Sequence, residues 1–195
     1  MAQSFRVVIK GISPYSQSKF IDKDEIPKEG KETADAYEKR TWQSRMHVDK
    51  KGNAFMPPMA LKKAVEGASK YAGKIPGERN ATYSKRFKSG LLVTDQITLF
   101  TEDGKVARAD DFEGEWLFLD AGGKAGQGGT RVKRRMPRIV NWTAEAVVHV
   151  IDEVITEDVL ERVLVDAGRF VGVGRFRPEV GGFYGRFQLD SIEEI

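Results

Sequence analysis

Residues 168–187, GRFVGVGRFRPEVGGFYGRF, join the last predicted helix of the chain to its last predicted strand. The segment contains six glycines, four arginines and five aromatic residues, a mixture that few globular cores need. Glycine lets a backbone lie close to a ligand, arginine pairs with phosphate in a planar fork, and aromatic faces accept stacked bases. The segment therefore favours contact with a nucleic-acid backbone. A structural alternative stays open, in which Phe170, Phe176 and Phe187 are buried in a turn and the arginines are solvated.

The rest of the chain carries alternating strand and helix signals. In residues 5–10, apolar Phe5, Val7 and Ile9 alternate with Arg6 and Lys10, which is typical of a strand, although Val8 breaks the strict alternation. Apolar residues at helical spacing predict a helix over 59–72, opened by Pro57 and Pro58, and a second helix from an N-cap at Thr156 to a stop at Gly168. Further strands are predicted at 91–100, 115–120, 147–151 and 183–189, a strand or short helix at 37–49, and a basic loop at 74–90.

Taken in order, these elements form a βαββαβ pattern within a single domain covering residues 1–195. This pattern predicts an α+β fold with a ferredoxin-like, RRM-like core, in which the helices pack on one face of the sheet. Two insertions are expected, one at about 13–56 and the other at about 103–142. The second would be a long, hairpin-like, basic excursion between the two central strands.

Composition limits the function classes. The chain has 195 residues, 31% of them charged, and no apolar run approaches the roughly 20 residues of a membrane-spanning helix. The N-terminus lacks an apolar signal core and there is no cysteine, so we expect a cytosolic protein without disulfides. Cysteine is absent and only His47 and His149 are available, so zinc is not expected. Dinucleotide and P-loop motifs fail on spacing, with Arg177 standing where GxGxxG needs its last glycine. No cofactor is expected.

Positive charge is concentrated in one block. No acidic residue lies between Ala121 and Ala144, whereas the net charge of the whole chain is only +3. The block contains six cations, namely Lys124, Arg131, Lys133, Arg134, Arg135 and Arg138. Such a block favours binding of a polyanion, although a solvated, mobile loop is the alternative.

One cluster suggests chemistry. His47 follows Arg40, Trp42 and Arg45, and a histidine among arginines can act as general acid or base on a phosphodiester. No second proton-transfer group and no nucleophile are identifiable, and phosphate binding alone explains the same residues.

The stretch AGRFVGVGRFRPEVGGFYGRFQL at 167–189 resembles the helix, glycine-rich loop and strand that end members of the RAMP superfamily of CRISPR-associated RNA-binding proteins. The long excursion between the central strands is similar to the thumb of the backbone subunits that polymerise along guide RNA. The chain also resembles tailed-phage proteins that share YEKRTW at 37–42, MPPMALKKA at 56–64, GRFRP at 174–178 and GGFYGRF at 181–187.

The resemblance implies roles for particular residues. The glycine-rich loop that lies against RNA corresponds to Gly172, Gly174, Arg175, Arg177, Gly181 and Gly182, and the thumb that inserts between bases corresponds to Lys124 and residues 131–135. No equivalent of the acidic residue that cuts target RNA in some members is identified, so cleavage is not implied.

Together, these observations predict a non-enzymatic, cytoplasmic binder of single-stranded RNA or DNA, with RNA preferred, that assembles into an oligomer or filament. If the protein is phage-encoded, the cytoplasm is that of the host. The expected contacts are Arg40, Trp42, Arg45, His47, Lys124, Arg131, Lys133, Arg134, Arg135, Gly172, Gly174, Arg175, Phe176, Arg177, Tyr184 and Arg186, with Phe183 as an alternative stacking residue. Two other functions stay open. One is a metal-independent endoribonuclease that uses His47, and the other is a mimic of a CRISPR backbone subunit that disturbs assembly of effector subunits.

Overall fold

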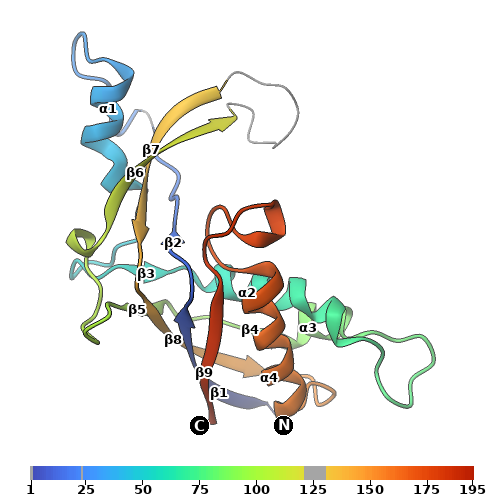
Figure 1. Ribbon diagram of the computed structural model, residues 1–195. Coiled ribbons are helices and arrows are strands. Elements are labelled where there is room, and N and C mark those ends of the chain that lie inside the picture. The colour runs from blue at the N-terminus through green and yellow to red at the C-terminus, as the bar shows by residue number, and fades with distance from the viewer. Residues whose placement is uncertain (1, 23, 121–130) are drawn as a thin grey trace.

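The computed structural model describes residues 2–22, 24–120 and 131–195 of the chain. It combines helices with two antiparallel sheets, so the predicted α+β class is confirmed. In Figure 1 the larger sheet and most of its helices occupy the lower part of the molecule, and a hairpin projects from them. None of the helices in the described residues is long and apolar enough to cross a membrane.

The larger sheet is built around β1 (Gln3–Gly11), which pairs antiparallel with β8 on one side and β9 on the other. Its strands, in spatial order, are β3 (Phe55–Met56), β5 (Ile97–Phe100), β8 (Thr143–Val150), β1 and β9 (Phe187–Glu194), and β4 (Leu91–Leu92) also pairs with β8. Phe5, Val7 and Ile9 alternate along β1 and are fully buried on one face, as the sequence pattern predicted.

Two helices contribute to the core below that buried face. The first is α2 (Pro58–Ala68), which begins at a proline and continues as a 3₁₀ turn, η2 (Ser69–Ala72). The second is α4 (Glu157–Asp166). Leu61 of α2 and Leu160 of α4 are fully buried in the same apolar cluster as Phe5, so burial of one helical face joins helices and sheet into one core.

The end of α4 differs from the prediction of a stop at Gly168. The helix continues through a π-helical turn, η4 (Ala167–Val171), and ends at Gly172, whose φ is 73°. Gly168 instead lets the helix pack closely against the backbone of β9, because a Cβ there would lie 2.0 Å from the carbonyl oxygen of Phe187. Thr156 has the extended backbone of an N-cap, but its side chain makes no capping hydrogen bond.

The smaller sheet consists of β2 (Tyr15–Ser16), β7 (Arg131–Ile139) and β6 (Glu113–Asp120). Strands β6 and β7 pair antiparallel from Glu113 opposite Arg138 to Asp120 opposite Arg131, and this hairpin extends away from the core (Figure 1). Residues 121–130, including Lys124, lie outside the described part of the chain. The basic segment at 131–138 is therefore a strand, which excludes the loop alternative for this part of the block.

Several predicted elements need correction. The segment at 74–90 was expected to be a loop, but it contains α3 (Tyr83–Gly90), whose Phe87 is fully buried. The single strand expected at 91–100 is divided into β4 and β5. The last strand was expected at 183–189 but begins at Phe187, because Gly185 with a φ of 66° keeps the preceding residues in the loop.

The region at 37–49, expected to be a strand or a short helix, is helical. It contains most of α1 (Ala34–Thr41), and a 3₁₀ turn, η1 (Trp42–Arg45), follows directly. Helix α1 begins at Thr33, whose hydroxyl accepts a hydrogen bond from the Ala36 amide at 3.2 Å. Two further 3₁₀ turns are η3 (Ala109–Asp111) and η5 (Pro178–Val180).

Candidate nucleic-acid interface

The glycine-rich loop after α4 docks on the segment that follows β1. The Arg175 amide donates to the Ser16 carbonyl at 2.8 Å, and the Gly185 amide donates to the Pro14 carbonyl at 2.7 Å. Gly174 fits against this segment because a Cβ there would lie 2.3 Å from the Ser16 carbonyl oxygen, and a Cβ at Gly182 would lie 1.8 Å from the Phe176 carbonyl oxygen. Of the predicted loop glycines, Gly172, Gly174 and Gly181 adopt positive φ. These glycines allow the loop to fold onto the protein, and this rigid docking fixes the side chains between them.

Two of the predicted loop arginines have internal partners. Arg177 donates through Nε and Nη2 to Glu179 at 3.0 and 2.9 Å, and through Nη1 to the Gly174 carbonyl at 3.3 Å. Arg186 donates to the Arg169 carbonyl. A phosphate would have to compete with these acceptors, so neither guanidinium is freely available in this conformation.

Arg175 is different. Within the described residues, no carboxylate lies within ion-pair distance of its guanidinium, which lies 5.3 Å from the centre of the Phe176 ring. Burial lowers the pKa of Arg175, and the nearby charge of Arg45 lowers it further. Phe176 adopts a φ of 55°, in the left-handed region that a phenylalanine rarely occupies. The loop thus holds a partly buried cation beside another cation.

The aromatic residues of the loop have unequal access to a ligand. Tyr184 is only 4% exposed, and its hydroxyl donates to Glu115 of β6 and accepts from Arg138 of β7 at 3.3 Å. Burial, followed by the Glu115 hydrogen bond, raises the pKa of Tyr184. Phe183 is 62% exposed, with its ring centre 4.6 Å from that of Tyr184. Tyr184 therefore connects the loop to the hairpin, and Phe183 is the more accessible stacking surface.

The cations of the hairpin face α1 and the strand beside them. Lys133 donates to Asp35 of α1 at 2.8 Å, and Arg138 binds Glu113 and Glu115. The guanidinium of Arg135 makes no carboxylate contact among the described residues; it lies 5.5 Å from the Trp42 ring centre, and its Nε donates to the Gly114 carbonyl at 3.2 Å. Arg131 is exposed at the start of β7.

Glu38 joins α1, η1 and β7 through one buried carboxylate. It accepts from Arg45 Nη2 at 3.0 and 3.1 Å, from Arg134 Nη1, and from the Arg135 amide at 3.1 Å. Burial alone would raise the pKa of Glu38, but Arg134, the Arg135 amide and Arg45 overcome that effect and lower it. We call Glu38, Arg45, Arg134 and Arg175 the arginine junction.

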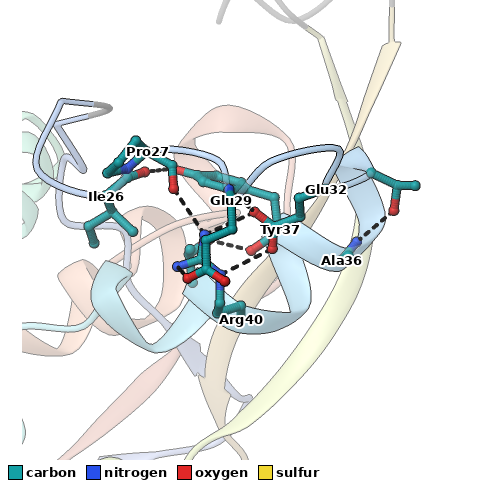
Figure 2. A network of polar contacts seen from close by, with 9 residues as sticks. Ile26, Pro27, Glu29, Glu32, Ala36, Tyr37 and Arg40 are labelled. Carbon is teal, nitrogen blue, oxygen red and sulfur yellow. Dashed lines mark hydrogen bonds and ion pairs between the residues drawn. The ribbon is translucent and has the colours of Figure 1, made fainter.

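Arg40 lies away from the arginine junction. Its guanidinium donates to Glu32 at 2.9 and 3.1 Å and to the Pro27 carbonyl at 3.0 Å, and it also pairs with Glu29 at 3.3 Å (Figure 2). The Glu32 hydrogen bond is the main reason that the pKa of Arg40 is raised. Three of the four predicted residues of this region are thus divided, with Arg40 held in an acidic cluster, Trp42 under Arg135 and Arg45 in the arginine junction.

His47 is half-buried and packs on Phe55, with ring centres 5.7 Å apart. Burial lowers the pKa of His47, and the charge of Lys19 lowers it further, so the ring is neutral near pH 7. In the described part of the chain the ring has no hydrogen-bond partner, and no group of three or more His, Asp or Glu side chains is arranged to hold a metal. A partner for proton transfer is therefore missing from the described residues around His47.

Sequence reasoning missed two residues that the structure brings to this site. Ser16 and Gln17 are buried between the loop and η1, and both lie in the insertion expected at about 13–56. The structure leaves three buried atoms here without hydrogen-bond partners: Ser16 Oγ, Gln17 Nε2 and Arg45 Nε. No signal in the sequence distinguishes these residues from their polar neighbours, because their partners are distant along the chain.

The fold has solved counterparts. The crystal structure of Cmr6 from Pyrococcus furiosus is similar to this protein, with a TM-score of 0.51 and 13% sequence identity. The superposition covers 97% of this protein and 98% of the Cmr6 chain. This protein also superposes over its full length on a chain of the Type III-B Cmr-beta complex bound to cognate target RNA, with a TM-score of 0.50 and 15% identity. The chain spans 61% of the length of that second protein.

Sequence comparison adds nothing to this likeness, since no family model and no curated protein matches the chain. At 13–15% identity, the structural likeness concerns the fold alone. It shows that the chain shares the fold of these solved proteins, in agreement with the α+β class that the sequence predicted.

Proposed function

We propose that this protein binds single-stranded nucleic acid without cleaving it, RNA in preference to DNA, along a surface formed by the glycine-rich loop and the base of the hairpin. The observation that carries the proposal is the arginine junction, where Arg45 and Arg134 share one buried carboxylate, Glu38, while Arg175 beside Arg45 has no carboxylate partner among the described residues. A polyanion is the ligand that balances such an excess. Phe183, exposed on the same loop as Arg175, offers a stacking face for a base.

The fold supports this proposal by analogy. The order β5, β8, β1, β9 in the larger sheet fits a ferredoxin-like core, with a hairpin inserted between β5 and β8. We include in the proposal a single RAMP-like domain with insertions at about 13–56 and 103–142, a phage origin, and side-by-side assembly along the strand. Lys124 and Arg131 would extend the binding surface toward the end of the hairpin.

Nuclease activity is not part of the proposal, because His47 has no partner for proton transfer among the described residues. A second candidate function is supported by the likeness to Cmr6, over nearly the whole length of both chains. In that alternative the protein imitates an effector subunit and binds other subunits rather than RNA. Specific capture of purified effector subunits after nuclease treatment would favour this alternative.

The proposed function is tested by fluorescence anisotropy with a labelled oligouridine RNA, the matching DNA strand and a duplex of equal length. We expect the single strands to bind more tightly than the duplex, and RNA more tightly than DNA. With about three phosphate contacts per protomer, log affinity should fall against log salt with a slope of roughly −2. A slope near zero, or equal affinity for the duplex, contradicts the proposal.

Matched variants locate the surface. Arg175→Gln should weaken RNA binding more than Arg177→Gln, because Glu179 already neutralises Arg177. Phe183→Ala should weaken binding of the strand with no change in fold, since its ring is largely exposed. Equal losses of RNA affinity for Arg175→Gln and Arg177→Gln would show that the arginine junction is not part of the binding surface.

A further inference from the structure

The buried atoms without partners lie where two arginines approach each other. The Arg175 amide donates to the Ser16 carbonyl at 2.8 Å, so the Arg175 backbone is held beside Ser16 and its neighbour Gln17. Arg45 is close enough to Arg175 for its charge to lower the pKa of that guanidinium. The β2 segment, η1 and the glycine-rich loop therefore meet at one place.

The orientation of each group at this place is fixed by other bonds. Gln17 Oε1 accepts from the His47 backbone amide at 3.0 Å, so the NH₂ group of the Gln17 side chain is the one without a hydrogen-bond partner. Arg45 Nη2 donates to both oxygens of Glu38, which leaves Nε without an acceptor. Gln17 is 3% exposed and the Arg45 side chain 12%, so water has little access to satisfy either donor.

The unsatisfied groups are mostly donors. Gln17 Nε2 and Arg45 Nε can only donate, the Ser16 hydroxyl can donate, and the Arg175 guanidinium adds five N–H groups with no carboxylate acceptor among the described residues. Leaving a buried donor without a hydrogen-bond partner costs roughly 1–3 kcal/mol. One tetrahedral anion with several acceptor oxygens would satisfy them together and offset the repulsion between the two arginines.

We propose that Arg175, Arg45, Gln17 and Ser16 form a site for one phosphate group, which enters from the side of the partly exposed Arg175. The chemistry is that of a phosphate oxygen, whether the group belongs to a free ion or to a nucleic-acid backbone. That it is the backbone phosphate of a bound strand rests on the proposed function. In that case this phosphate anchors the strand at the glycine-rich loop, and the other contacts follow from it.

Thermal unfolding in inorganic phosphate, against chloride at equal ionic strength, tests the site without any nucleic acid. The wild type and the control Arg162→Gln, an exposed arginine on α4, should gain about 3 °C in Tm when phosphate is ten-fold above its Kd. Arg175→Gln should lose this gain. Gln17→Glu should also lose it while staying folded in chloride, because the added carboxylate occupies the place of the anion. An unchanged gain in both site variants overturns the proposal.

Binding of an oligouridine RNA identifies the source of the phosphate. If the anchor is a backbone phosphate, Arg175→Gln should make the salt slope less steep by about 0.7, the value of one phosphate contact, and Arg162→Gln should leave it unchanged. If phosphate stabilises the wild type but no RNA binds, the site binds free phosphate ion and the proposed function is wrong. If RNA binds but Arg175→Gln alters neither the slope nor the phosphate response, the anchor site falls and the proposed function stands.

Discussion

The apolar core below the larger sheet and the arginine junction at the base of the hairpin are held together by different forces. The core contains fully buried side chains such as Phe5, Leu61 and Leu160, which are stabilised by removal of apolar surface from water. The junction depends on one buried carboxylate, Glu38 of α1, and on cations from η1, β7 and the loop. The comparison teaches that pH and ions should act on the hairpin and loop first, and on the core last.

The largest effect is expected in the core. Phe5→Ala should lower the free energy of unfolding by about 4 kcal/mol, because it removes a large buried side chain and leaves a cavity. Val8→Ala, on the opposite face of β1, is the control and should cost much less. Urea unfolding followed by circular dichroism measures both. A similar loss for the two variants would contradict the one-sided burial of β1.

A smaller and more local effect is expected at the junction. Glu38→Gln should cost about 2 kcal/mol, because it removes the charge that compensates Arg45 and Arg134. Hydrogen exchange should increase in α1 and β7 while the amides of β1 and β8 stay protected. Glu32→Gln, at the pair with Arg40 outside the arginine junction, is the matched control and should leave β7 unchanged. Faster exchange throughout β1 and β8 would show that the two regions unfold together.

The pH dependence sharpens the same contrast. The pKa of His47 is lowered in the folded protein, so below its ordinary value of 6.5 the unfolded chain binds the proton more readily. Stability should therefore fall as pH drops below about 6.5, by at most about 1.4 kcal/mol per pH unit. In His47→Gln this part of the pH dependence should vanish. A wild-type curve that stays flat between pH 7 and pH 5 would show that His47 is not desolvated.

The smallest effects distinguish the two helix starts. Thr33→Ala should destabilise α1 by about 1 kcal/mol, because its hydroxyl caps the Ala36 amide. Thr156→Ala should change stability by only a few tenths of a kcal/mol, since that side chain makes no capping bond at α4. Thermal unfolding of the two variants measures the difference. The opposite ranking would indicate that α4 is capped in solution.

The sequence predicted the core much better than the interface. Phe5, Val7 and Ile9 recur at every second position, and Leu160 and Val163 recur at helical spacing, so local periodicity was enough to find β1 and α4. Helix α3 was missed because its two buried aromatic residues lie within a strongly basic segment. The start of β9 was misplaced because the aromatic content of the loop imitates a strand.

At the interface, the glycine-rich loop was recognised but the state of its arginines was not. Arg175 and Arg177 are two residues apart and identical in type, yet only Arg177 has a carboxylate partner. Tyr184 was expected to be available to bases, but it is buried against Glu115, 69 residues away in the chain. Ser16 and Gln17 carry no sequence signal at all.

Periodicity along the chain was sufficient to specify the α+β class and the main core elements, and local composition was sufficient to find the basic and glycine-rich segments. Both signals depend only on neighbours within a few residues. The assignment of free and neutralised cations depends on pairs such as Glu38 with Arg134, which are 96 residues apart. Such pairs exist only after the sheets have formed and the loop has docked. Electrostatic balance at the binding surface is therefore a property of the folded arrangement, since charges interact through space and not along the chain.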